Sequence, residues 1–179
     1  SDPARRGKGY ALAFGVDALR AAPPAVVVVL DADCVIGPGA LGRLVARAHA
    51  GRCPVQAAYR MTAPAAGGAD RRVAAFAFLV KNVVRPLGLR RLGLPCLLTG
   101  SGMAFPWPVL AAARPGDGHL VEDMHLAVEL ACGGHLTRFA PDAGVTAEFP
   151  AADAAAAAQR RRWEHGHLRV VLAGVPRLL

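Results

Sequence analysis

Two aspartates, Asp31 and Asp33, stand one residue apart directly after an apolar run at residues 26–30. A run rich in β-branched residues predicts a strand that is buried on both faces. Two carboxylates that leave such a strand can bind a hard divalent cation through oxygen, and that cation can neutralise a diphosphate. The alternative is a turn in which an aspartate caps the following helix. The length of the buried run favours the metal-binding interpretation.

A second acidic pair, Glu122 and Asp123, stands at the start of a segment with helical periodicity at residues 121–132. A carboxylate there can serve as a general base if its pKa suits the task. A helix N-terminus lowers that pKa, whereas burial and nearby carboxylates raise it, and the sequence leaves the balance open. The alternative is helix capping, because the helix dipole favours acidic residues in the first turn.

A third group, Gln159, Arg162 and Trp163, falls on one face of a predicted helix near the end of the chain. The planar guanidinium of arginine matches phosphate oxygens, and the flat face of tryptophan can stack on a sugar ring. The alternative is a basic helix that faces solvent or a membrane.

The elements that must position these residues alternate along the chain, as apolar periodicity and turn residues indicate. Helices are expected at residues 10–21, 38–49, 71–84, 121–132 and 151–172, and strands at 25–30, 55–59, 97–105, 135–139 and 144–149. Alternation of this kind predicts a layered α/β fold with a mainly parallel sheet. Ligands of such sheets bind at the carboxyl ends of the strands, where Asp31 and Asp33 fall.

The motifs, taken in chain order, resemble those of a known family. They are KGYAL at residues 8–12, DAD at 31–33, TGSG at 99–102, ED at 122–123 and QRRRW at 159–163. The chain is similar over residues 5–169 to processive-type family 2 glycosyltransferases, which include cellulose, chitin and hyaluronan synthases and bacterial exopolysaccharide enzymes. The resemblance implies the three-layer, Rossmann-like GT-A fold of nucleotide-diphospho-sugar transferases, with a mainly parallel mixed sheet whose first strands are missing from this chain. Residues 1–150 would form a partial catalytic domain, and without the first strands we do not expect this chain to be fully active. Residues 151–179 would hold the QRRRW helix and the start of a membrane-proximal segment.

The resemblance also implies a role for each motif residue. Asp123 would be the general base with Glu122 beside it; Lys8, Asp31, Asp33, Gln159 and Arg162 would bind the donor and its diphosphate; and Gly100, Ser101, Gly102 and Trp163 would bind the acceptor. Asp33 would hold Mg²⁺ or Mn²⁺. One metal site and one separate base imply a single displacement with inversion, because a retaining mechanism would need a second nucleophile.

The expected function is therefore transfer of a sugar from a nucleotide-diphosphate donor, with a UDP-sugar favoured, to a saccharide or lipid-linked acceptor in bacterial polysaccharide synthesis. The family's usual location is the cytoplasmic face of the bacterial inner membrane. The amphipathic, basic segment at residues 73–98 suits either a membrane surface or packing on the domain core. A nucleotidyltransferase and a catalytically silent membrane- or partner-binding fragment are the alternatives.

The amino-acid composition limits the class of protein and the kinds of partner that this chain can have. The 179 residues are 54% hydrophobic and 19% charged, which predicts one globular domain rather than a disordered chain. A net charge of +8 suits nucleic acid, anionic lipid or a phosphorylated substrate. Only two tryptophans are present, too few to stack on successive bases, so nucleic-acid binding is not expected. The four scattered cysteines predict buried thiols in a reducing compartment rather than a metal or redox site.

Overall fold

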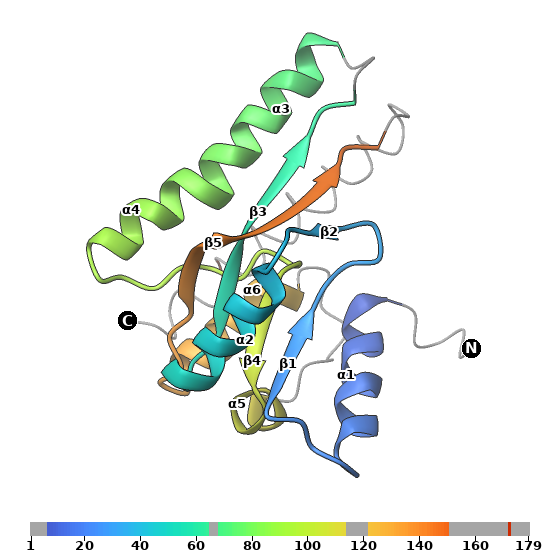
Figure 1. The fold of residues 1–179 in the computed structure, drawn as a ribbon, viewed down its shortest axis with the longest axis vertical. Coiled ribbons are helices and arrows are strands. Elements are labelled where there is room, and N and C mark those ends of the chain that lie inside the picture. The colour runs from blue at the N-terminus through green and yellow to red at the C-terminus, as the bar shows by residue number, and fades with distance from the viewer. Residues whose placement is uncertain (1–6, 65–67, 114–121, 151–171, 173–179) are drawn as a thin grey trace.

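The computed structural model describes residues 7–64, 68–113, 122–150 and Leu172, and these form a layered α/β fold (Figure 1). The elements are α1 (Lys8–Leu19), β1 (Val26–Val29), β2 (Val35–Ile36), α2 (Ala40–Gly51), β3 (Val55–Thr62), α3 (Ala69–Leu79), η1 (Val80–Val84), α4 (Arg85–Arg91), β4 (Met103–Pro106), α5 (Trp107–Ala113), α6 (Glu122–Cys132) and β5 (Arg138–Glu148). The predicted α/β class is therefore confirmed. The helix predicted at residues 151–172 lies outside the described residues, apart from Leu172.

The five strands form one mixed sheet in the order β1-β4-β3-β5-β2. Strands β1, β3 and β5 run in one direction, while β4 and β2 run against them. The sheet is thus mixed as predicted, but it is not mainly parallel: three of its four strand pairings are antiparallel, and the parallel pairing joins β3 to β5, its two longest strands. Because parallel strands end at the same edge of a sheet, the carboxyl end of β1 points the same way as those of β3 and β5.

Helices cover both faces of this sheet, which gives three layers (Figure 1). Helix α2 packs on the face formed by alternate residues of β3, β4 and β5. Leu44 of α2 is buried there together with Ala57 of β3 and Ala104 of β4. Helices α1, α5 and α6 pack on the opposite face of β1 and β4, around Met103 and Phe105. The η1 and α4 segments cover β3 and β5 on this second face, opposite α2.

Helix α3, the π-helical turn η1 and α4 continue into one another as a long rod beside β3 (Figure 1). Phe78 anchors the rod, since its ring meets Tyr59 and Phe149 edge to face at centroid distances of 5.2 and 6.0 Å. The helix predicted at 71–84 is confirmed, and it extends further than predicted. Within the described parts of the chain, no helix has the length and apolar character needed to span a bilayer.

Three details differ from the expected elements. The strand expected at 97–105 is limited to Met103–Pro106, because Gly100 and Gly102 adopt φ angles of +90° and +68° that a ladder does not allow. The two strands expected at 135–139 and 144–149 are one strand, β5, interrupted by an irregularity where Ala57 pairs with Ala140 and Ala58 with Gly144. Strand β2 and helix α5 were not predicted, since both are too short to show a period.

Two arginines of α2 contact the irregular part of β5. Arg43 Nε donates to the carbonyl of Asp142 at 2.8 Å, and both guanidinium nitrogens of Arg47 bond the Asp142 carboxylate, one of them at 2.8 Å. These contacts join α2 to the turn that interrupts β5. They therefore tie α2 to the irregular part of β5, which pairs with β3 on both sides of it.

Candidate active site

The chain leaves β1 in a tight turn that presents Asp31. The N–H of Cys34 donates to the Asp31 carbonyl at 3.0 Å, which closes the turn at residues 31–34. Lys8, in the first turn of α1, places its ammonium on the Asp31 carboxylate and within 2.5 Å of the Gly100 carbonyl. Both charged side chains are about one-third exposed, at 31% and 34%, so a ligand can reach them from solvent.

Asp33 and Cys34 complete a cluster of possible metal ligands beside Asp31. One ligand atom from each of the three residues lies within 4.8 Å of the other two. The carboxylate oxygens of this set suit Mg²⁺ or Mn²⁺, so the residues fit the cation that the sequence predicts. Neither aspartate caps α2, whose N-cap is Gly39 with no side-chain bond, so the capping alternative is wrong.

A glycine turn, residues 99–102, lies next to Asp31. The N–H of Asp31 donates to Ser101 Oγ at 3.1 Å, and Ser101 Oγ contacts Cys34 Sγ at 3.1 Å. Ser101 is fully buried, so it supports the end of β1 from beneath. Gly102 is also buried, against Ala57 and Val145, and only Gly100 of these three is partly open to solvent. Acceptor binding by these three residues stays a prediction, and in this structure it could be direct only at Gly100.

Asp123 reaches the same place from α6. A side-chain carbon at Gly100 would stand 3.4 Å from Asp123 Oδ2 and 3.7 Å from Lys8 Nζ. The carboxylate of Asp123 and the ammonium of Lys8 therefore lie on the same side of the glycine turn. Both Glu122 and Asp123 belong to the first turn of α6, where the helix dipole favours acidic residues, so the position is compatible with either helix capping or catalysis.

Lys81 is a basic residue of the site that the sequence analysis named only within a charged segment. It lies in η1, and burial lowers its pKa, while Asp123 opposes that shift and Arg85 adds to it. The chain has only two lysines, Lys8 and Lys81, among its 21 basic residues. Both lysines interact with an acidic residue of this site. Because the others among these 21 residues are arginines, the presence of a lysine is the sequence signal that could have marked position 81 as a candidate site residue.

Tyr59 lies beneath the acidic turn. Its hydroxyl is 3.6 Å from Cys34 Sγ. Burial, then the contact with Cys34 and the negative charges of Asp31 and Asp33, raises the pKa of the Tyr59 hydroxyl far above its ordinary value. Tyr59 therefore stays protonated and acts as a hydrogen-bonding support rather than as an acid or base.

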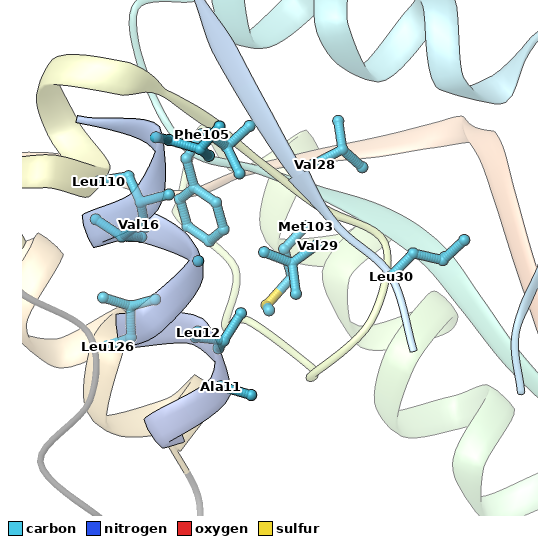
Figure 2. Close-up of a pocket in the computed structure, with 13 residues that line it drawn as sticks. Ala11, Leu12, Val16, Val28, Val29, Leu30, Met103, Phe105, Leu110 and Leu126 are labelled. Atoms are coloured by element: carbon cyan, nitrogen blue, oxygen red, sulfur yellow. The ribbon is translucent and has the colours of Figure 1, made fainter. Parts of the chain in front are cut away.

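A separate cavity of about 230 Å³ lies between α1 and β1 (Figure 2). Leu12 and Val16 of α1 face Val29, Met103 and Phe105 across it. Its lining carries no charged side chain, so it offers nothing to a diphosphate. Within the part of the chain that the structure describes, the charges needed for phosphate chemistry gather instead at the end of β1.

Four predicted site residues have no described side chain. Gln159, Arg162 and Trp163 lie outside the described residues, and of Glu122 only the helical backbone is described. The structure thus brings together five of the predicted polar residues and glycines in contact around one turn, namely Lys8, Asp31, Gly100, Ser101 and Asp123, with Asp33 beside them. This arrangement can bind a cation and an anion together and can offer a separate carboxylate to accept a proton.

Comparison with known proteins supplies an independent finding. A family model described as "Glycosyltransferase like family 2" matches residues 1–166. The match covers every helix and strand named above together with Gln159, Arg162 and Trp163. A comparison with curated proteins gives no match.

Proposed function

This chain belongs to glycosyltransferase family 2, and from that membership we propose that it transfers a sugar from a nucleotide-diphosphate donor to a saccharide or lipid-linked hydroxyl, with inversion. Its three-layer fold with a mixed sheet is a GT-A fold. The observation that carries the proposal is the meeting of Lys8, Asp31 and Asp33 at the carboxyl end of β1, where ligands of α/β sheets bind. The family does not favour a nucleotidyltransferase or a nucleic-acid-binding module.

The donor end of the reaction belongs to the residues around Asp31. Asp31 and Asp33 would hold Mg²⁺ or Mn²⁺, which when bound would neutralise charge on the diphosphate leaving group. The Lys8 ammonium, held by Asp31 and the Gly100 carbonyl, is placed to bind a phosphate oxygen beside it. Positive charge fixed before the reaction begins stabilises the charge that develops on the leaving group.

The acceptor end belongs to Asp123. Its carboxylate would take the proton of the acceptor hydroxyl while that oxygen bonds to the anomeric carbon of the donor. The bond from that carbon to the diphosphate oxygen breaks, and its electron pair leaves with the diphosphate. Attack on the face opposite the leaving group inverts the anomeric centre. Lys81, which interacts with Asp123, favours the ionised form of the base.

The finer predictions extend this scheme. Gln159 and Arg162 would bind the diphosphate and Trp163 the acceptor sugar, with Glu122 beside the base. UDP is the favoured nucleotide, and the product is assigned to bacterial polysaccharide synthesis at the cytoplasmic face of the inner membrane. These assignments rest on the resemblance of the motifs in this chain to those of the family.

Thermal unfolding with a panel of nucleoside diphosphates tests the donor site. We expect one of them to raise the unfolding temperature by roughly 5–10 °C at about 100 times its Kd, and only with Mn²⁺ present. Asp33→Asn should remove this rise. Asp17→Asn, which changes an exposed carboxylate on α1 that pairs with Arg20, should keep it. A rise that survives Asp33→Asn would contradict the proposed metal site.

Membrane association is part of the same proposal and rests on the outer face of the α3–η1–α4 rod. Val73, Phe76, Val80 and Val84 recur at helical spacing and are 66%, 66%, 39% and 53% exposed. Exposed arginines flank this apolar stripe at residues 72, 85, 90 and 91. An apolar stripe edged with positive charge suits the surface of an anionic bilayer.

Co-sedimentation with lipid vesicles tests this surface. Vesicles that contain phosphatidylglycerol should bind the chain, and pure phosphatidylcholine should bind it more weakly. Phe76→Ser should weaken binding about tenfold, because a buried phenylalanine contributes about 1.5–3 kcal/mol. Phe14→Ser is the matched control, since Phe14 is 76% exposed on α1, away from the rod. Equal losses from the two variants would count against the rod as the docking face.

A further inference from the structure

Gln56 is a fully buried polar side chain in the middle of the sheet, and every hydrogen it offers is used. Its Nε2 donates to the carbonyls of Ala57 at 3.0 Å and Ser101 at 2.9 Å, and its Oε1 accepts the N–H of Thr99 at 2.9 Å. Gln56 has an exposed fraction of 0%. An amide is costly to bury unless it is paired, so an aliphatic residue would suit this strand position better if packing were its only role.

Two of these bonds hold the glycine turn of the site at both ends. Thr99 and Ser101 flank Gly100, whose carbonyl receives the Lys8 ammonium at 2.5 Å. Ser101 in turn receives the N–H of Asp31. A continuous set of contacts therefore runs from β3 through Gln56 to the turn, and from the turn to Lys8 and Asp31.

Three other hydrogen bonds reach the turn, from the Lys8 ammonium to the Gly100 carbonyl, from the Asp31 N–H to Ser101 Oγ and from the Ala57 N–H to the Gly102 carbonyl. Residues 97–102 lie outside the strand ladder, so no strand pairing fixes their backbone. Gly100 has a φ angle of +90°, and because glycine can adopt many backbone conformations, contacts with neighbouring residues must select this one. The Thr99 hydroxyl is buried and finds no hydrogen-bond partner among the described residues, so it does not anchor the turn. The Ala57 N–H bonds Gly102 at the far end, and the two bonds from Gln56 tie both flanks of Gly100 to the interior of the sheet.

We propose that Gln56 is a positioning residue of the donor site, which sets the place of the Gly100 carbonyl and through it the place of the Lys8 ammonium beside Asp31. The inference rests on the proposed function, in which Lys8 and Asp31 bind the donor diphosphate and its cation. Gln56 itself touches no substrate. Its loss would therefore weaken diphosphate binding through a displaced Lys8.

The lysine content of the chain gives a direct readout of that displacement. With ¹³C-labelled lysine, only Lys8 and Lys81 give Cε signals, and Lys81→Arg identifies which is which. The Asp31→Asn variant serves as a reference, because it gives the change in the Lys8 Cε chemical shift that is expected when Lys8 loses its carboxylate partner. Gln56→Met, similar in length but without the hydrogen bonds, should move the Lys8 signal in the same direction and weaken binding of UDP or GDP with Mn²⁺ at least tenfold.

A second variant separates positioning from general loss of stability. In Gln56→Glu, the protonated side chain can still accept from Thr99 and donate to Ser101, whereas the ionised one faces two carbonyl oxygens. Burial raises the pKa of such a carboxyl group, so the wild-type Lys8 signal and nucleotide affinity should return as the pH is lowered. Leu44→Val, a core change under α2 on the other face, should lower stability and leave the Lys8 signal unmoved.

The outcomes are distinct. A Lys8 signal that stays in place in both Gln56 variants overturns the inference, as does a moved signal with unchanged nucleotide affinity. A wild-type chain that binds no nucleoside diphosphate of the panel with Mn²⁺ fails the proposed function and overturns the inference with it. Parallel changes in the Lys8 signal and the affinity, reversed at low pH only in Gln56→Glu, support it.

Discussion

Replacement of Asp123 by asparagine is expected to lower the rate of sugar transfer by about 10²–10⁴-fold, the usual contribution of a general base. Asparagine keeps the shape of the side chain beside Gly100 and Lys8, but it cannot accept the proton of the acceptor hydroxyl. The affinity for the nucleotide with Mn²⁺ should change little, because Lys8, Asp31 and Asp33 are untouched. Release of the nucleoside diphosphate from its sugar donor measures the rate.

Two comparisons make this result specific. Asp17→Asn, the same exchange on the exposed side of α1, should leave the rate unchanged. Asp33→Asn should lose both the rate and the metal-dependent affinity. A full rate in Asp123→Asn would remove this residue from the chemistry and would favour helix capping as its role, and an inactive wild-type chain that still binds nucleotide would favour the silent-fragment alternative.

Gly102→Ala is expected to destabilise the fold by roughly 2–5 kcal/mol. The new Cβ would stand 2.7 Å from Ala57 Cβ and 2.8 Å from Val145 Cγ2, distances that core atoms do not adopt. The φ angle of +68° adds backbone strain for any residue with a Cβ. Because β3 and β5 supply the two opposing side chains, relief of the clash would move the centre of the sheet. Urea unfolding measures the loss.

Gly93→Ala separates the two causes. Gly93 has a φ angle of +72°, nearly that of Gly102, yet no atom lies within 4 Å of its added Cβ. It should therefore show only the backbone cost, about 1 kcal/mol. Equal losses at the two positions would mean that the close approach of Gly102 to the sheet does not contribute.

The elements with strong periodicity were predictable from sequence, and those fixed by tertiary contacts were not. The valine run of β1 and the apolar face of α2 carry their own signals: β1 falls within its predicted segment, and α2 overlaps its predicted segment and ends two residues later, at Gly51. Strand β2 exists only through its pairing with β5, which no local pattern reveals. The π-helical turn η1 packs against β3, and its sequence carries no local pattern that distinguishes it from the α-helices on either side.

The charged residues of the site were predictable because their types and spacing carry chemistry, while its supports were not. Asp31 and Asp33 follow a valine-rich strand, and Asp123 lies in the first turn of a helix, so each has a signal in the sequence. The prediction that this strand is buried on both faces is wrong, because β1 lies at the edge of the sheet and only Val29 is buried. In the sequence, Gln56 is only one polar residue in a short predicted strand. Its hydrogen bonds to Thr99 and Ser101 are evident only in the folded structure, where the glycine turn packs over it. Ser101 was predicted on the acceptor side, yet its hydroxyl faces Asp31 and Cys34.

In the proposed function, Asp31 and Asp33 hold a divalent cation with the donor diphosphate beside Lys8. Paramagnetic Mn²⁺ broadens the NMR signals of nearby nuclei, and the chain's two lysines give a spectrum simple enough to follow one site. With the nucleoside diphosphate present, we predict that small amounts of Mn²⁺ broaden the Cε signal of Lys8 in the wild type and not in Asp33→Asn. A Lys8 signal that stays sharp while Mn²⁺ and the nucleotide bind would show that they bind elsewhere, and would contradict the account.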